Sequence, residues 1–165
     1  MQKSTLIPTL MAVLAVTAFE GACSSTGDAG SAGGGGTEEL TIAKAGNLKV
    51  TAPKGSKVED MMGDPAVKFP DGAMITLAKP STIQEADLDA AIKDARSSYQ
   101  GSSGYRKEKL ANGWIFSYVN KAPIGTMYMV SARLTFGDKV WMCSANTSSE
   151  AQQKRAEAAC KSLKQ

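Results

Sequence analysis

Histidine is absent from this chain of 165 residues, and the excess of positive charge is small. Histidine is the commonest general base and metal ligand in proteins, so its absence argues against most familiar hydrolase and metalloenzyme chemistries. The formal net charge is +3, from 19 basic and 16 acidic residues. A nucleic-acid-binding domain gathers its basic residues into one stripe. We therefore expect no nucleic-acid partner, no cofactor and no enzymatic activity.

Long apolar segments are also scarce. The mostly apolar run from Leu6 to Phe19 has 14 residues, fewer than the roughly 20 that a membrane-spanning helix needs. Lys3 precedes this run and small residues follow it, which is the pattern of a cleaved export signal. The sequence therefore predicts a signal peptide at residues 1–22 and an exported chain.

The residues around Cys23 carry a family resemblance. Gly21 and Ala22 stand directly before Cys23, and this arrangement resembles the lipobox of bacterial lipoproteins. The resemblance implies that Cys23 becomes the N-terminus after cleavage and carries a diacylglyceryl thioether. Glu20 departs from the family pattern, which has an aliphatic residue there. The alternative is an ordinary signal peptide cut after Ala18, which leaves Cys23 as a free thiol.

The segment after Cys23 bears on the location of the protein and on the link to its domain. Ser24 stands at the position where an Asp signals inner-membrane retention in enterobacterial lipoproteins. The resemblance thus implies a lipid-anchored envelope protein, in the outer membrane if the source has two membranes, on its periplasmic or surface side. Residues 23–39 are rich in Gly and Ser, so we expect the anchor to continue into a disordered tether. The globular domain is expected at residues 40–165.

The odd number of cysteines bears on whether Cys23 carries a lipid. An exported chain with three cysteines has one odd thiol. If Cys23 carries lipid, Cys143 and Cys160 can form a disulfide in an oxidising compartment. The alternative is two buried free thiols.

The sequence predicts an α+β domain. Three turn dipeptides, Asp71-Gly72, Asn112-Gly113 and Gly137-Asp138, predict antiparallel hairpins, because such residues supply positive φ angles. Helices are predicted near residues 83–99 and 149–163, the second with Thr147 at its start. Strands are predicted at 47–52, 66–69, 73–79, 105–111, 114–120, 126–136 and 139–146. An antiparallel sheet of about six strands flanked by two helices follows.

The order of these elements is similar to the fold of the PsbP photosystem subunit and of a Ran-binding import factor. The similarity lies in an opening strand that ends at Pro53, a middle helix, an antiparallel meander, and a final strand and helix from Val140 to Leu163. Many bacterial lipoproteins of unknown role look like this. The resemblance implies a PsbP-like α/β/α sandwich used for binding, with no catalytic residues to transfer.

Two sets of side chains are candidate sites. Tyr99, Tyr105, Trp114 and Tyr118 could line a ligand groove around the loop Gly101–Gly104, because amphipathic rings offer contact area and a polar handle. The alternative is that these rings build the core. Thioethers bind soft Cu(I), whereas methionine is also a common core residue. The methionines in question are Met61, Met62, Met74, Met127, Met129 and Met142.

These observations predict a lipid-anchored envelope protein that binds a protein or another envelope component. No metal site is expected, since no histidine or additional thiolate completes a copper site around the methionines. Two alternatives remain open. One is an envelope enzyme or small-ligand binder that uses the aromatic groove, and the other is a periplasmic Cu(I)-handling protein.

Overall fold

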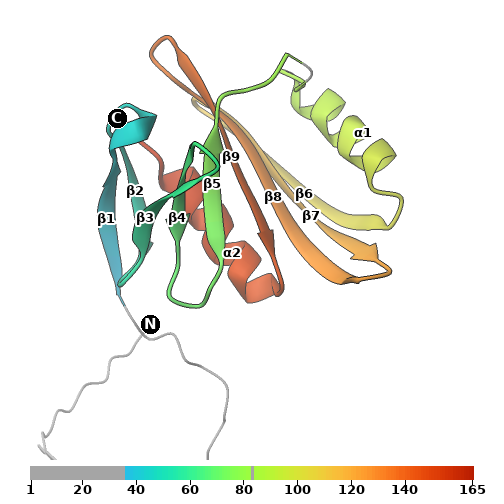
Figure 1. The fold of residues 1–165 in the computed structure, drawn as a ribbon. Coiled ribbons are helices and arrows are strands. Elements are labelled where there is room, and N and C mark those ends of the chain that lie inside the picture. Colours follow the sequence, from blue (N-terminus) through green and yellow to red (C-terminus); the bar gives the residue numbers. More distant parts are fainter. Residues whose placement is uncertain (1–35, 83) are drawn as a thin grey trace, which may run out of the picture. The chain divides into compact units, whose positions relative to one another are not determined.

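The computed structural model describes residues 36–82 and 84–165. The predicted signal peptide and Cys23 lie outside the described residues, as does most of the predicted tether. The elements appear in Figure 1. In chain order they are β1 (Thr37–Ile42), the 3-10 turn η1 (Ala43–Ala45), β2 (Leu48–Pro53), β3 (Lys57–Met61), β4 (Asp64–Lys68), β5 (Met74–Ala78), α1 (Leu88–Ser98), β6 (Ser102–Leu110), β7 (Gly113–Ala122), β8 (Gly125–Phe136), β9 (Lys139–Thr147) and α2 (Glu150–Ser162).

Seven strands form one antiparallel sheet in the order β3-β4-β5-β9-β8-β7-β6, and β1 pairs with β2 in a separate ribbon. The two helices lie on opposite faces of the sheet (Figure 1). Helix α1 packs over β6 and β7, whereas α2 packs against β2, β9 and β8. This arrangement confirms the predicted α+β fold, with seven strands in the sheet where about six were expected.

The additional strand in the sheet is β3, whose five residues are all exposed. Alternation of buried and exposed side chains is the signal by which a strand is recognised in a sequence, and β3 lacks it. It forms through a tight turn, in which Met62 and Gly63 have φ angles of 54° and 98°. The Asp60 carboxylate accepts a hydrogen bond of 2.8 Å from the Gly63 N–H and stabilises this turn.

Strand β1, which was not predicted, begins at Thr37, inside the segment predicted as tether and three residues before the expected start of the globular domain at Leu40. It is ordered by its pairing with β2 and by Glu39. The Glu39 carboxylate lies 3.1 Å from the Lys49 ammonium and 2.6 Å from that of Lys164. These contacts join β1 to β2 and to the end of the chain.

Both helices begin later than predicted. Helix α1 begins at Leu88 because the Asp87 side chain accepts hydrogen bonds of 2.9 and 3.0 Å from N–H groups of the first turn. Helix α2 is capped by Ser149, whose hydroxyl accepts from the N–H three residues on. Thr147 is not the cap, since its hydroxyl donates to the carbonyl of Tyr128 in β8 at 2.9 Å.

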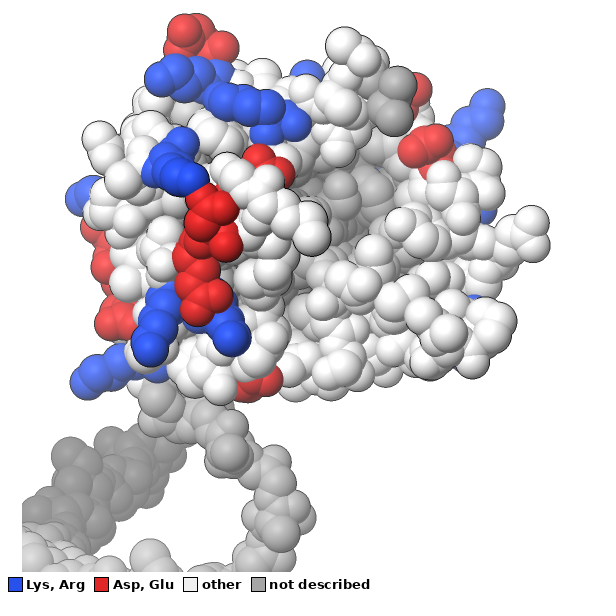
Figure 2. Space-filling view, viewed as in Figure 1, with Lys and Arg blue, Asp and Glu red and all other residues white. Residues whose placement is uncertain are grey.

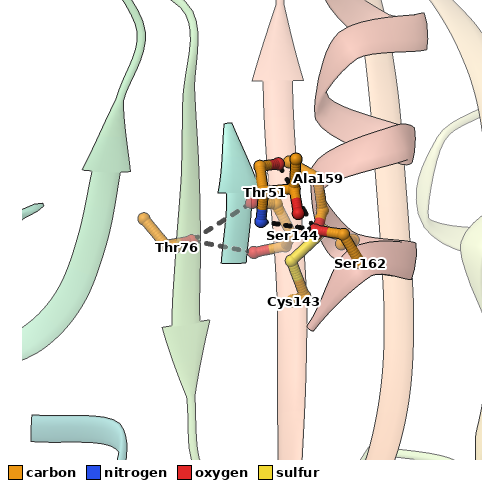
Figure 3. Close-up of a disulfide and its surroundings, with 7 residues drawn as sticks. Thr51, Thr76, Cys143, Ser144, Ala159 and Ser162 are labelled. Carbon is orange, nitrogen blue, oxygen red and sulfur yellow. Dashed lines mark hydrogen bonds between the residues drawn. A yellow bond between two sulfur atoms is a disulfide. The ribbon is translucent and has the colours of Figure 1, made fainter. Parts of the chain in front are cut away.

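The larger hydrophobic core lies between the sheet and α2. Cys143 of β9 and Cys160 of α2 are joined there by a disulfide, with their Cα atoms 5.8 Å apart and both residues fully buried (Figure 3). Close by, the Ser162 hydroxyl accepts a hydrogen bond of 2.8 Å from the Thr51 N–H, which ties α2 to β2. The helix is thus fastened to both β9 and β2.

Candidate functional site

The four aromatic residues predicted to lie together do so, on the α1 face of the sheet. Alternation along β7 places Trp114, Phe116 and Tyr118 on this face. The ring centroids of Tyr105 and Tyr118 are 4.9 Å apart, and those of Tyr99 and Tyr118 are 5.9 Å apart. Trp114 and Phe116 continue the row with centroids 5.6 Å apart. One continuous stack results.

Most of this stack is core rather than groove. Trp114 and Tyr118 are only 6% and 4% exposed, because α1 covers them with Leu88 and Ile92. The Trp114 indole N–H donates to the carbonyl of Ala86, just before the helix, at 2.9 Å. The helix therefore covers Trp114 and Tyr118, two of the four residues predicted to line a ligand groove. Of the four predicted groove residues, only Tyr99 and Tyr105 keep substantial exposure.

The Tyr118 phenol is held in its protonated form. Burial raises the pKa of Tyr118 well above its ordinary value, and the neighbouring hydroxyls of Tyr99 and Tyr105 add to the effect. A phenol in this environment does not supply a base near neutral pH.

The same face of the sheet continues over β8, β9 and β5, beyond the strands β6 and β7 that α1 mainly covers. Cross-strand pairing places Ser131 beside Ser144, and Ser144 beside Thr76. The hydroxyls of Thr76 and Ser144 lie 2.9 Å apart (Figure 3). Because these side chains are small, the floor of the face is low, and Figure 2 shows a hollow lined mainly by uncharged surface. We call this part of the sheet face the sheet hollow and define its floor by the neighbouring residues Thr76, Ser144 and Ser131 of β5, β9 and β8.

Methionines border the sheet hollow. Strand alternation places Met74, Met127, Met129 and Met142 on this face. The Asn146 side-chain amide donates to the Met127 thioether at 3.4 Å. The other two methionines singled out from the sequence, Met61 and Met62, lie at the turn between β3 and β4. The structure therefore brings four of the six methionines to one surface.

Arg133 is the charged residue that β5, β8 and β9 place on the face of the sheet hollow. It lies between Trp114 of β7 and Met142 of β9 and is half-buried. Within the described part of the chain, its guanidinium takes part in none of the salt bridges. A half-buried guanidinium retains five N–H donors, so Arg133 can bind an acidic group of a ligand.

Neither a cluster of metal-binding type nor a membrane-spanning helix occurs in residues 36–82 and 84–165. In these residues, no three Cys, Asp or Glu side chains lie close enough together to hold a metal ion, and the chain has no His. Neither described helix is long and apolar enough to cross a bilayer.

The fold has a counterpart among solved structures. The chain is similar to the solution structure of cyanobacterial PsbP (CyanoP) from Synechocystis sp. PCC 6803, with a TM-score of 0.51 and 12% identity. The match covers 84% of this chain and 97% of that chain. The domain has a PsbP-like fold. At this identity the likeness concerns the fold alone, and it confirms the architecture implied by the order of the elements. No family model matches the chain, and no curated protein matches it.

Proposed function

We propose that this protein is a lipid-anchored binding protein of a bacterial cell envelope and that it binds through the sheet hollow. The observation that carries the proposal is the open, mainly uncharged part of the sheet beside α1 (Figure 2). Concave surfaces on a rigid scaffold, with a few convergent polar groups, are the usual form of a binding site. The role is non-enzymatic and does not involve nucleic acid.

The disulfide supports the envelope location. Disulfides form and persist in oxidising compartments, and the bond between Cys143 and Cys160 is fully buried. With these two residues paired, Cys23 is the remaining cysteine and is available for the lipid. In a cell with two membranes, we place the anchor in the outer membrane.

The partner is a protein or another envelope component. The floor of the sheet hollow offers the hydroxyls of Thr76 and Ser144 for hydrogen bonds, and Met74 and Met129 offer adaptable apolar contact. Arg133 adds a binding point for one acidic group. The matching partner surface is mixed apolar and polar, with a single carboxylate or phosphate.

Filling the sheet hollow tests the binding site. Ser144 is exposed, so Ser144→Trp should block the floor without removing a core contact. We expect this variant to lose the partner that the wild-type chain retains when both are chemically cross-linked and purified from the native envelope. Lys154→Trp, on the outer side of α2, is the matched control and should retain it. Equal recovery with both variants would exclude the sheet hollow as the binding site.

The anchor is tested separately. Mass spectrometry of the protein from its native host should find a diacylglyceryl group on Cys23, and Cys23→Ser should release the chain from the membrane fraction. An unmodified N-terminus upstream of Cys23 would contradict the anchoring.

The methionines favour a second candidate function, Cu(I) handling. Met74, Met127, Met129 and Met142 share one face, and thioethers prefer Cu(I). If this function holds, excess Cu(I) should raise the melting temperature of the mature chain carrying Cys23→Ser, and the double change of Met127 and Met129 to Leu should abolish the increase. An unchanged melting temperature would remove the candidate.

A further inference from the structure

A second recess lies away from the sheet hollow, between α1 and β6. It has a volume of about 290 Å³. Ile92 and the ring of Tyr105 give it an apolar surface, and charged side chains complete the lining. We call it the α1–β6 pocket. Its lining residues are Asp89, Ile92, Lys93, Arg96, Tyr105 and Lys107.

The charges of the α1–β6 pocket are unequal. Lys93, Arg96 and Lys107 face one carboxylate, Asp89, so the net charge of the lining is 3 − 1 = +2. The Lys107 ammonium hydrogen-bonds the Asp89 carboxylate at 2.5 Å, and this bond holds the pKa of Asp89 below its usual range. Lys109 lies close enough to lower that pKa further. The Asp89 carboxylate is therefore already paired with Lys107 of β6. The two cations that α1 contributes to the lining, Lys93 and Arg96, are available to a ligand.

Arg96 is held in a position suited to a ligand. Its guanidinium carbon lies 4.8 Å from the centroid of the Tyr105 ring. Stacking on an aromatic ring uses the face of the guanidinium and leaves its N–H edge available for a bidentate contact with an oxyanion. The position is thus fixed by packing and does not require a carboxylate partner.

The basic residues of the two helices differ in their salt bridges. On α2, Lys154, Arg155 and Lys161 each form a salt bridge with a carboxylate. On α1, neither Lys93 nor Arg96 takes part in a salt bridge among the described residues. A surface with paired charges needs no ligand, whereas two unpaired cations beside a recess attract an anion.

We propose that the α1–β6 pocket binds the phosphate group of a small phosphate ester or of a phospholipid headgroup. A phosphate ester offers several oxygens to the Arg96 fork and to the Lys93 ammonium, and its charge offsets the positive lining. A recess of this volume also accommodates a small group attached to the phosphate, and this group packs against Ile92 in the lining. The pocket shares no residue with the sheet hollow, so this inference stands or falls independently of the proposed function.

Titration of the mature Cys23→Ser chain with glycerol 3-phosphate tests the proposal. NMR signals of Lys93, Arg96 and Tyr105 should shift in a saturable way. Arg96→Gln and Lys93→Gln should each weaken the affinity by about tenfold, since each removes a charge-assisted hydrogen bond. Lys57→Gln is the matched control, because Lys57 is exposed on β3, at the opposite edge of the sheet from β6, and its loss changes the net charge equally.

Vesicles distinguish the two sources of phosphate. Phosphatidylcholine vesicles with and without phosphatidylglycerol are the probes, and the fraction of protein bound is measured. Binding to the anionic vesicles that falls with Arg96→Gln but not with Lys57→Gln would identify a lipid headgroup as the source. Saturable binding of glycerol 3-phosphate, without such vesicle binding, would identify a soluble ester. The proposal is overturned if glycerol 3-phosphate shifts none of the pocket signals and the anionic vesicles bind no protein. It is also overturned if Arg96→Gln, Lys93→Gln and Lys57→Gln weaken binding equally.

Discussion

Cys143 and Ser144 are neighbours in β9, yet their side chains serve opposite faces of the sheet. Cys143 forms the buried disulfide with α2, whereas the Ser144 hydroxyl meets that of Thr76 on the floor of the sheet hollow (Figure 3). The closed face of the sheet carries most of the core, and the open face carries the candidate binding surface. Changes on one face should therefore leave the other largely intact.

Removal of the disulfide tests this separation. The double change of Cys143 and Cys160 to Ala opens a loop with a sequence separation of 17, and we expect a loss of roughly 3 kcal/mol in the free energy of unfolding. Urea denaturation measures this loss. Recovery of the envelope partner should be unchanged at a temperature at which the variant is folded. Loss of the partner from the folded variant would contradict the separation of the two faces.

The buried amide of Gln153 should be a second strong contributor to stability. Gln153 is 1% exposed and donates hydrogen bonds of 2.9 Å to the carbonyls of Tyr118 and Met129, while its oxygen accepts one from Arg106. Gln153→Ala leaves these groups without their partner and should cost about 2 to 3 kcal/mol in urea denaturation. The adjacent exposed change Lys154→Ala is the control and should cost less than about 0.5 kcal/mol. Similar costs for the two variants would refute the role of Gln153.

Tyr118 should make the fold sensitive to alkali. Its pKa is raised in the folded state, so above about pH 10 the unfolded chain releases a proton that the folded chain keeps. The free energy of unfolding should then fall as the pH rises, and the contribution of the buried phenol should be fully present only below that pH. Denaturation of wild type and Tyr118→Phe from pH 8 to about pH 11 measures this difference. We expect the wild type to lose stability relative to the variant above about pH 10, and parallel curves would disprove the assignment.

Glycine at position 101 should be sterically required. A Cβ atom built there would lie 2.1 Å from the Lys121 carbonyl oxygen, whereas one at Gly63 meets nothing within 4 Å. Gly101→Ala must move backbone and should destabilise the domain by about 1 to 3 kcal/mol, measured by thermal or urea unfolding. Gly63→Ala serves as the control for backbone strain without a clash, since its φ angle is 98°. A larger loss from Gly63→Ala than from Gly101→Ala would contradict the steric argument.

Local signals in the sequence were sufficient for the hairpins and for the second helix. The turn dipeptides Asp71-Gly72 and Gly137-Asp138 lie between paired strands, because the φ angles they permit depend on a few adjacent residues. The hairpin predicted at Asn112-Gly113 also forms, with Asn112 in the turn and Gly113 as the first residue of β7. Strand β3 was not predictable in this way, since its exposed residues show no alternation. The pairing of Cys143 with Cys160 followed from cysteine parity together with the short distance in sequence between a strand and the helix that covers it.

The candidate sites depended on long-range packing. The aromatic row was visible in the alternation of β7, but its burial depends on where α1 packs, which no local pattern records. Likewise, the floor of the sheet hollow joins Thr76 to Ser144, which are 68 residues apart in the chain. Single Ser and Thr residues in strands carry no signal of their own. The unpaired cations of α1 become visible only when the salt bridges of the folded chain are known.

Site-specific photo-cross-linking in the native envelope tests the central claim most directly. A photoreactive amino acid is placed at Ser144 in the sheet hollow or at Lys154 on the outer side of α2, in a chain that keeps Cys23. The account predicts a discrete adduct from position 144 and none from position 154. No adduct from position 144, or adducts in equal yield from both positions, would contradict it.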